Sequence, residues 1–264
     1  MLIDESASFG ALSLCSDRYL PDTAHRTLEN LPSPLPGLFL PSIFLNGSGL
    51  TNAWFAETFG AEEKRAGSEQ GLSAFDLLAA RAAAVSPGSE GLIALGLFGG
   101  RLYPSDPSIR GMWLGQSWIH RKEHFYRALL ESIAYEYATV LSIMRTNYPD
   151  LPFDEVRVIG GGARSDVWNQ IKADVMGIRY VRLARDDSAM LGGILLAGSA
   201  VGVYDDLPTE ASRFVVKTRA DEPDERKTAH YARYVEIYRG LFDREREVFQ
   251  SLQKIPPYGE QAST

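Results

Sequence analysis

Residues 155–177 limit the possible folds more than any other segment, because an apolar strand runs directly into three consecutive glycines and then into a helix. We expect the strand at Glu155–Ile159 and the helix at Ser165–Met176. Glycine permits a positive φ and a close approach of the backbone to a neighbour. The first N–H groups of a helix have no internal partner and carry partial positive charge. The segment therefore predicts either an anion or nucleotide site or a turn needed only for close strand–helix packing, and alone it does not separate the two.

A second strand and helix follow immediately, at Tyr180–Leu183 and Ser188–Val203. The second helix carries small residues along one face, which permit close contact with another helix (the commoner cause) or with a bound ring. Two adjacent crossings that open toward the same sheet edge form a cleft of the kind in which α/β proteins bind ligands. The glycines match neither G-x-G-x-x-G nor G-K-[ST], which argues against a Rossmann dinucleotide site and a P-loop.

The rest of the chain also alternates strands with helices. Further strands are expected at 7–14, at 38–47 and within 88–100, and further helices at 49–60, 73–84, 120–145 and 230–252. The charged stretch 218–227 is expected to be a solvated turn before the last helix. This alternation favours an α/β domain with a largely buried sheet.

Composition excludes several classes of protein. The 264 residues are 45% hydrophobic with a net charge of −7, which suits a folded globular chain and argues against nucleic acid or an anionic membrane as the main partner. No apolar run approaches the length of a membrane span, and the N-terminus lacks the features of a signal peptide. Cys15 is the single cysteine, so the chain has no intramolecular disulfide, and a cytoplasmic location is expected.

Several motifs, in order along the chain, resemble those of the FGGY family of carbohydrate kinases, and of the xylulose kinases in particular. These are "LNGSGLTNAWF", "GLFGGRLYPSDPSIRGMWLG", "HRKEHFYRALLESIAYEY", "GGGARSDVWNQIKADVMGIRYVRL", "DDSAMLGGILLAGSAVGVYDDL" and "EPDERKTAHYARYVEIY". The likeness extends from about Ile3 to Leu252. It implies an actin-like ATPase fold of two ribonuclease-H-like lobes that close over sugar and ATP.

The resemblance concerns only the C-terminal, ATP-binding lobe of that family. It implies a single domain over 1–252 with a mixed sheet flanked by helices and a long C-terminal helix, a tail at 253–264, and absence of the N-terminal sugar-binding lobe. It also implies cofactor-binding roles near adenosine, the phosphates or the interlobe cleft. The residues that it implicates are Ser6, Gly47, Gly49, Gly161, Gly162, Ala163, Asn169, Gln170 and Asp187. Trp168 is expected to belong to the core instead.

One segment departs from the family pattern. The family has a Gly-Thr pair that holds ATP phosphates near the start of this lobe, where the present chain has Asp4-Glu5-Ser6-Ala7. In one register Ser6 preserves the hydroxyl, and in the other two carboxylates replace both residues. Either register puts an acid beside the triphosphate, which is repulsive unless Mg²⁺ bridges the two.

The resemblance also implies that the catalytic base lies in the N-terminal lobe, so no catalytic residue is expected in this chain. ATP and Mg²⁺ are the expected cofactors, held jointly with the other lobe, and ATP or ADP and a sugar are the expected partners; a homodimer is left open. His120 and His124 have a spacing that zinc sites use, but no third ligand accompanies them, and no metal site is expected. Asp106 and Arg110 are expected to stabilise a turn through an internal ion pair.

Two functions follow as hypotheses. The first is ATP-dependent phosphorylation of a sugar hydroxyl, with the pentulose xylulose as the first guess for the substrate. The alternative is a non-catalytic nucleotide-binding or interaction module related to a carbohydrate kinase. The absence of a G-x-S-x-G motif argues against a serine hydrolase.

Overall fold

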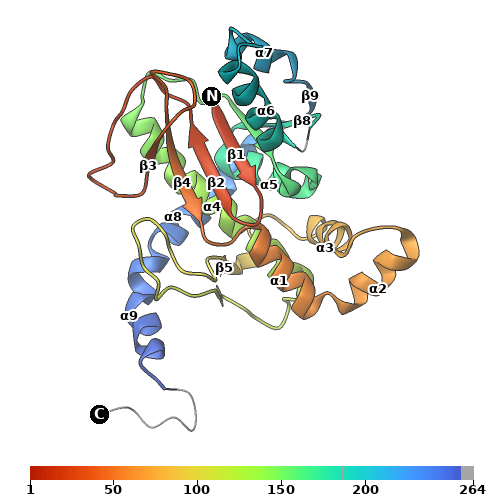
Figure 1. Cartoon of the computed structure of the whole chain (residues 1–264). Coiled ribbons are helices and arrows are strands. Elements are labelled where there is room, and N and C mark those ends of the chain that lie inside the picture. Colours follow the sequence, from red (N-terminus) through yellow and green to blue (C-terminus); the bar gives the residue numbers. More distant parts are fainter. Residues whose placement is uncertain (186, 257–264) are drawn as a thin grey trace.

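The computed structural model (Figure 1) describes residues 1–185 and 187–256. Its main sheet has 7 strands in the order β3-β4-β2-β1-β7-β8-β9. The strands are β1 (Leu2–Ser6), β2 (Gly10–Leu14), β3 (Glu29–Pro32), β4 (Phe39–Leu45), β7 (Glu155–Ile159), β8 (Arg179–Leu183) and β9 (Lys217–Asp221). A second sheet pairs β5 (Ile93–Leu95) with β6 (Met112–Leu114).

The centre of the main sheet is parallel and its two sides are antiparallel. β1 pairs with β7 and β7 with β8 in parallel, whereas β2, β3, β4 and β9 join through antiparallel ladders. Parallel neighbours require crossover connections, which α4 (Lys122–Asn147) and α5 (Asp166–Met176) provide. The mixed α/β sheet with flanking helices that the sequence predicted is therefore confirmed.

One face of the sheet carries the core. There α4 contacts α5 and α8 (Glu225–Arg239), and Figure 1 shows α4 running behind the strands. The strands alternate as a half-buried sheet requires: Leu2, Val156 and Val158 point into the core, whereas Glu5 on the opposite side of β1 is exposed. This alternation decides which residues of β1 lie under the helices.

The remaining helices lie at the ends of the sheet. The helices α1 (Gly49–Phe59), α2 (Ala61–Gln70) and α3 (Ala74–Ala83) form a group beside the start of α4, while α6 (Ser188–Ala200) and α7 (Leu207–Arg213) lie beside β8 and β9 (Figure 1). The 3₁₀ turns η1 (Ser89–Gly91) and η2 (Gly161–Arg164) precede β5 and α5. No helix in the described part of the chain combines the length and apolar character that crossing a bilayer requires.

Several details differ from the expectations. The strand expected at 7–14 begins at Gly10, because residues 7–9 form the turn between β1 and β2. Part of the charged stretch 218–227 is not a turn, because β9 pairs with β8 along the edge of the sheet. The single C-terminal helix is divided at Gly240, a poor helix former, into α8 and α9 (Leu241–Gln253). Asp106 does not pair with Arg110 but with Arg246, at 3.0 Å, while the guanidinium of Arg110 donates to main-chain carbonyls of its own turn. Of the expected tail, residues 257–264 lie outside the described residues.

Candidate nucleotide site

The glycine turn joins the carboxyl end of β7 to the start of α5. Gly160 has φ +85°, a conformation that side chains rarely adopt, and a Cβ there would lie 2.8 Å from the carbonyl oxygen of Ser6. The chain then forms η2, and Ser165 caps α5 by accepting a hydrogen bond of 3.3 Å from the Trp168 N–H. The turn therefore presents backbone and a helix N-terminus beside the end of β1.

A second wall comes from the start of α1. The N–H groups of Gly49 and Leu50 donate to the carbonyl oxygens of Ala7 and Ser8, at 3.0 and 2.9 Å. Those two carbonyls belong to the turn between β1 and β2, so this turn and α1 are held together. A Cβ on Gly49 would collide with the Ala7 carbonyl, which explains the glycine at that position.

A cavity of about 680 Å³ lies between these walls. We call it the glycine-loop cavity. It is lined by Ser6, Ala7, Ser8, Gly49, Leu50, Asn52, Ala53, Ser73, Phe75, Asp76, Tyr126, Leu130, Gly161, Gly162, Arg164, Ser165 and Trp168. Of the nine residues expected to bind the cofactor, four line this cavity: Ser6, Gly49, Gly161 and Gly162. They come from three segments that are distant in the sequence.

The other five expected residues lie outside this lining. Asn169 is completely buried, and its amide donates to the Ala163 carbonyl at 2.8 Å. Gln170 donates to Asp174 and to the Glu222 carbonyl. The amide nitrogens of both residues therefore donate within the protein, whereas Asn169 Oδ1 is buried and has no hydrogen-bond partner among the described residues. Direct contact of either residue with a nucleotide stays a prediction.

Ala163, Asp187 and Gly47 are placed as follows. Ala163 is buried beneath the loop, where its carbonyl also accepts from Arg182. Asp187 pairs with the exposed Arg185 at 2.8 Å, and this ion pair holds the pKa of Asp187 below its usual range. Gly47 precedes α1 and packs against the Thr51 side chain. Their roles in binding also stay predictions.

Asp4 does not stand unpaired beside the loop. Its carboxylate is completely buried and lies 2.6 Å from the ammonium of Lys172, which is equally buried. Glu5 points to the opposite, exposed side of β1. The repulsion expected from the segment Asp4-Glu5 is therefore offset by a lysine that the sequence analysis did not identify. The available signal was Lys172 itself, which stands four residues after Trp168 on the inward side of α5.

The carboxylate in the cavity lining is Asp76. It accepts hydrogen bonds from the Ser73 hydroxyl at 2.7 Å and the Ser73 N–H at 2.9 Å as part of the cap of α3 (Ala74–Ala83). These bonds hold the pKa of Asp76 below its usual range. A carboxylate that is already hydrogen-bonded and weakly basic is a poor proton acceptor for a sugar hydroxyl.

The two histidines at the start of α4 are not arranged as metal ligands. His120 Nδ1 accepts from the Ser117 N–H at 2.8 Å, and His124 Nδ1 accepts from the Arg121 N–H at 3.1 Å. The neutral rings then carry their proton on Nε2, so neither nitrogen offers a lone pair to a metal. Among the described residues, no group of three or more His, Cys, Asp or Glu side chains is placed to hold a metal ion.

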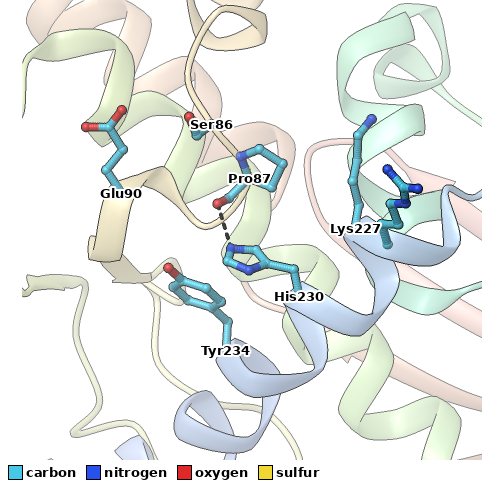
Figure 2. Close-up of a pocket in the computed structure, with 7 residues that line it drawn as sticks. Ser86, Pro87, Glu90, Lys227, His230 and Tyr234 are labelled. Atoms are coloured by element: carbon cyan, nitrogen blue, oxygen red, sulfur yellow. Dashed lines mark hydrogen bonds between the residues drawn. The ribbon is translucent and has the colours of Figure 1, made fainter.

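A second, smaller hollow of about 420 Å³ lies between η1 and α8 (Figure 2). Figure 2 shows His230 reaching the Pro87 carbonyl, a contact of 3.1 Å, with Glu90 and Lys227 on opposite sides. Lys227 also lies 3.3 Å from Asp174, and Glu90 lies 3.7 Å from His124. Because Lys227 and Glu90 both have charged groups of the protein nearby, and because this hollow is smaller than the glycine-loop cavity, it is the weaker candidate for a ligand site.

Comparison with known proteins identifies the family to which the chain belongs. Residues 16–201 match the model of the C-terminal domain of the FGGY family of carbohydrate kinases. The gluconokinase of Bacillus subtilis is 30% identical over 198 residues, which are 75% of this chain and 38% of that protein. The xylulose kinase of Lactococcus lactis is 30% identical over 208 residues, which are 78% of this chain and 39% of that protein.

The fold agrees with this result. The structure of ligand-bound xylulose kinase from Lactobacillus acidophilus superposes with a TM-score of 0.81 at 21% identity, covering 95% of this chain and 48% of that one. The chain thus spans about two fifths of the length of these curated relatives and about half of that solved structure. The match over residues 16–201 shows that the chain belongs to the FGGY family of carbohydrate kinases, with the actin-like ATPase fold of that family.

Proposed function

We propose that this chain supplies the ATP-binding half of a kinase that phosphorylates a sugar hydroxyl, and that the nucleotide binds in the glycine-loop cavity. The observation that carries the proposal is the meeting of Ser6, Gly49, Gly161 and Gly162 in one cavity at the N-terminus of α5. Backbone that a ligand can approach closely, next to a helix N-terminus, suits a phosphate group.

The cavity has two chemically different regions, which is what a nucleotide requires. Leu50, Phe75, Tyr126 and Leu130 provide apolar surface of the kind that packs on a purine ring. The loop and the residues of β1 provide backbone N–H groups and hydroxyls. A cavity of about 680 Å³ lies within the range of roughly 300–1,000 Å³ that is usual for small-molecule sites.

The reaction would transfer the γ-phosphoryl group from ATP to a sugar hydroxyl. The hydroxyl oxygen bonds to phosphorus, the bond between phosphorus and the ADP oxygen breaks, and the hydroxyl proton passes to a base. Asp76 is unsuited to that step because the Ser73 hydrogen bonds lower its pKa. We propose that the base and most sugar contacts belong to the part of the relatives' length that this chain does not span.

Mg²⁺ is the metal that we expect to accompany ATP. It usually keeps several waters and binds one or two carboxylates together with substrate phosphates. Asp76 is the carboxylate of the described lining, so we propose that Mg²⁺ would take most of its ligands in this half of the site from the ATP phosphates and from water. Its role would be to offset charge on the phosphates during transfer.

We propose xylulose as the first substrate to test. The resemblance to xylulose kinases supports this choice, and the equal identity of the gluconokinase makes gluconate the second candidate. The alternative function is a non-catalytic nucleotide-binding or interaction module. The engagement of Asp76 by Ser73 favours this alternative for the chain acting alone, because the described lining then lacks a suitable base.

Calorimetric titration of the chain with ADP and ATP, each with and without Mg²⁺, tests the nucleotide site. We expect saturable binding of both nucleotides with one site per chain, and competition between them. GTP or inorganic phosphate binding as tightly as ATP would argue against an adenine-nucleotide site. Absence of any nucleotide binding by the folded chain would remove both the kinase proposal and its non-catalytic nucleotide-binding alternative.

A further inference from the structure

A cluster of four buried polar side chains lies directly behind the glycine-loop cavity. Asp4, Ser6, Tyr137 and Lys172 come from β1, α4 and α5. Asp4, Tyr137 and Lys172 are each 0% exposed, and Ser6, which also lines the cavity, is 1% exposed. Ser6 is thus the member of the cluster that connects the buried charged groups to the glycine-loop cavity.

The cluster is a closed hydrogen-bond network. Lys172 Nζ contacts Asp4 Oδ2 at 2.6 Å and also donates to Ser6 Oγ. The Ser6 hydroxyl donates to Asp4 Oδ1 at 2.9 Å, and the Tyr137 hydroxyl donates to the same oxygen at 3.1 Å. The Lys172 ammonium also lies 3.9 Å from the centre of a Trp168 ring. Every charged group in the network therefore has a partner.

The protonation of the network favours this arrangement. Burial raises the pKa of Tyr137 well above its ordinary value, and the Asp4 carboxylate raises it further, so the phenol remains a donor. Burial lowers the pKa of Lys172, and the Asp4 carboxylate opposes that shift. A buried ion pair of this kind is not by itself a source of stability, because desolvation offsets the attraction between the charges. The position of the Asp4–Lys172 pair next to Ser6 suggests a role in ligand binding instead.

The hydrogen-bonding capacity of the Ser6 hydroxyl indicates this role. A serine hydroxyl has one proton to donate and two lone pairs to accept with. In this structure the proton is directed at Asp4, and Lys172 occupies one lone pair. If the hydroxyl rotates toward a ligand in the cavity, Asp4 keeps the hydrogen bonds from Tyr137 and Lys172, and Lys172 keeps hold of the Ser6 oxygen. Rotation therefore leaves no buried charge without a partner.

We propose that Lys172 is a positioning residue for the nucleotide: its ammonium fixes the Ser6 oxygen while the Ser6 hydroxyl exchanges its hydrogen bond from Asp4 to a phosphate oxygen of the ligand. The proposal rests on the proposed function, since it assumes that a nucleotide phosphate enters the glycine-loop cavity. It assigns to Tyr137 the matching task of stabilising Asp4 once Ser6 has turned away.

The first test compares ADP with adenosine by calorimetric titration of four variants. Ser6→Ala should weaken ADP binding about tenfold, the usual effect of losing one hydrogen bond to a charged group. Ser6→Thr, which keeps the hydroxyl, should restore affinity to within about threefold of wild type. The variant Asp4→Asn/Lys172→Met removes both buried charges together and should also weaken ADP binding about tenfold. Adding Ser6→Ala to it should weaken ADP binding no further, because both changes act on one hydrogen bond.

Adenosine separates positioning from damage to the fold. It has no phosphate, so its affinity should stay unchanged in all four variants, whereas a merely structural role would weaken both ligands equally. Three results would each overturn the proposal. They are equal losses for ADP and adenosine, additive effects of Ser6→Ala and Asp4→Asn/Lys172→Met, and wild-type ADP affinity in the folded Asp4→Asn/Lys172→Met variant, which we call the charge-free variant.

A second variant keeps the test decisive if the charge-free variant does not fold. Tyr137→Phe removes one of the two donors that Asp4 retains after Ser6 rotates, so ADP binding should weaken by about threefold to tenfold and adenosine binding should not change. Tyr180→Phe is the matched control, because the buried Tyr180 hydroxyl donates its hydrogen bond to Met176 Sδ and not to Asp4. Unchanged ADP affinity in Tyr137→Phe, or an equal loss in Tyr180→Phe, would overturn the proposal.

The two proposals fail in different ways. If the wild-type chain binds neither ADP nor ATP, the proposed function fails and the positioning role fails with it. If wild type binds ADP and Ser6→Ala weakens that binding while Asp4→Asn/Lys172→Met and Tyr137→Phe do not, the proposed function stands and the roles assigned to Lys172 and Tyr137 are wrong.

Discussion

A Cβ atom on Gly162 would lie 2.7 Å from the Cβ of Ser6, whereas a Cβ on the neighbouring Gly161 would have no non-neighbouring atom of the described chain within 4 Å. Both glycines line the same cavity. Gly162 is therefore needed for the loop to close against β1, and Gly161 leaves space on the side where a ligand would approach. Within this one turn, Gly162 therefore serves packing, whereas Gly161 is the position at which binding can be tested.

We predict that Gly161→Val weakens ADP binding at least about tenfold while leaving the fold unchanged. A Cβ at this position has open space around it, and the branched side chain would occupy the space in which the backbone would approach a phosphate. Calorimetric titration gives the affinity, and thermal melting with circular dichroism shows whether the fold is intact. Wild-type affinity in a folded Gly161→Val variant would mean that the loop is only a packing turn.

Gly162→Ala is the matched variant for packing. Its methyl group would press on Ser6 and on the Trp168 ring, so we expect a loss of roughly 1–3 kcal/mol in the free energy of unfolding. A valine at Gly162 would disturb the fold as well as the site, which makes Gly161 the better position for testing binding.

The sequence was sufficient to predict the parallel strands β7 and β8 and the glycine turn. The strand β7 lies at the residues where it was expected, and α5 begins one residue after its expected start because Ser165 caps it. Trp168 was expected in the core and is 2% exposed. These features depend on neighbours a few residues away, which a local pattern records.

What the sequence did not predict depends on contacts between distant segments. The edge strand β9 is polar and owes its existence to pairing with β8, so it resembled a surface turn. Asp4 and Lys172 stand 168 residues apart, and each alone resembles a surface charge. The division at Gly240 was visible only as one glycine in an amphipathic pattern.

We predict that Glu131→Ala lowers the free energy of unfolding by about 3–5 kcal/mol. The Glu131 carboxylate is completely buried and accepts from the Gly88 N–H, the Ser89 hydroxyl, Arg127 and Tyr231, so it joins η1, α4 and α8. Its removal leaves the buried Arg127 guanidinium without its charge partner. Urea unfolding followed by circular dichroism measures the change.

The control for that measurement is Glu69→Ala, on an exposed position at the end of α2. It should change the free energy of unfolding by no more than about 0.5 kcal/mol. If the two variants have the same free energy of unfolding, the loss of one charge explains the effect and the buried network contributes nothing to stability.

We predict that Glu136→Gln stabilises the protein at pH 8 and that this gain shrinks toward zero as the pH falls to 4. Burial of the Glu136 carboxyl raises its pKa, while Arg101, at 3.6 Å, and the hydroxyl of Tyr238 oppose the shift. The folded state therefore binds the proton more tightly than the unfolded state, so Glu136 lowers stability as the pH rises from its ordinary pKa of 4.5 through the raised value.

Urea unfolding of wild type and Glu136→Gln across that pH range gives the difference directly. Glutamine resembles the protonated glutamate in shape and carries no charge at any pH, so it serves as the reference without titration. A difference that does not vary with pH, or that grows as the pH falls, would show that Glu136 is not the group responsible.

The last prediction concerns catalysis by the chain alone. We expect it to bind ATP weakly and to show no sugar-dependent ATP turnover, because Asp76, the carboxylate in the described lining, is held by Ser73 at a lowered pKa. A missing general base costs about 10²–10⁴ in rate, and an open site also loses the positioning that closure provides. The measurement is ADP release with D-xylulose, D-ribulose, gluconate, glycerol and no sugar. Stimulation by any of these to even about 1 s⁻¹, an ordinary kinase rate, would mean that a base lies within these residues; Asp76→Asn would then show whether Asp76 is that base.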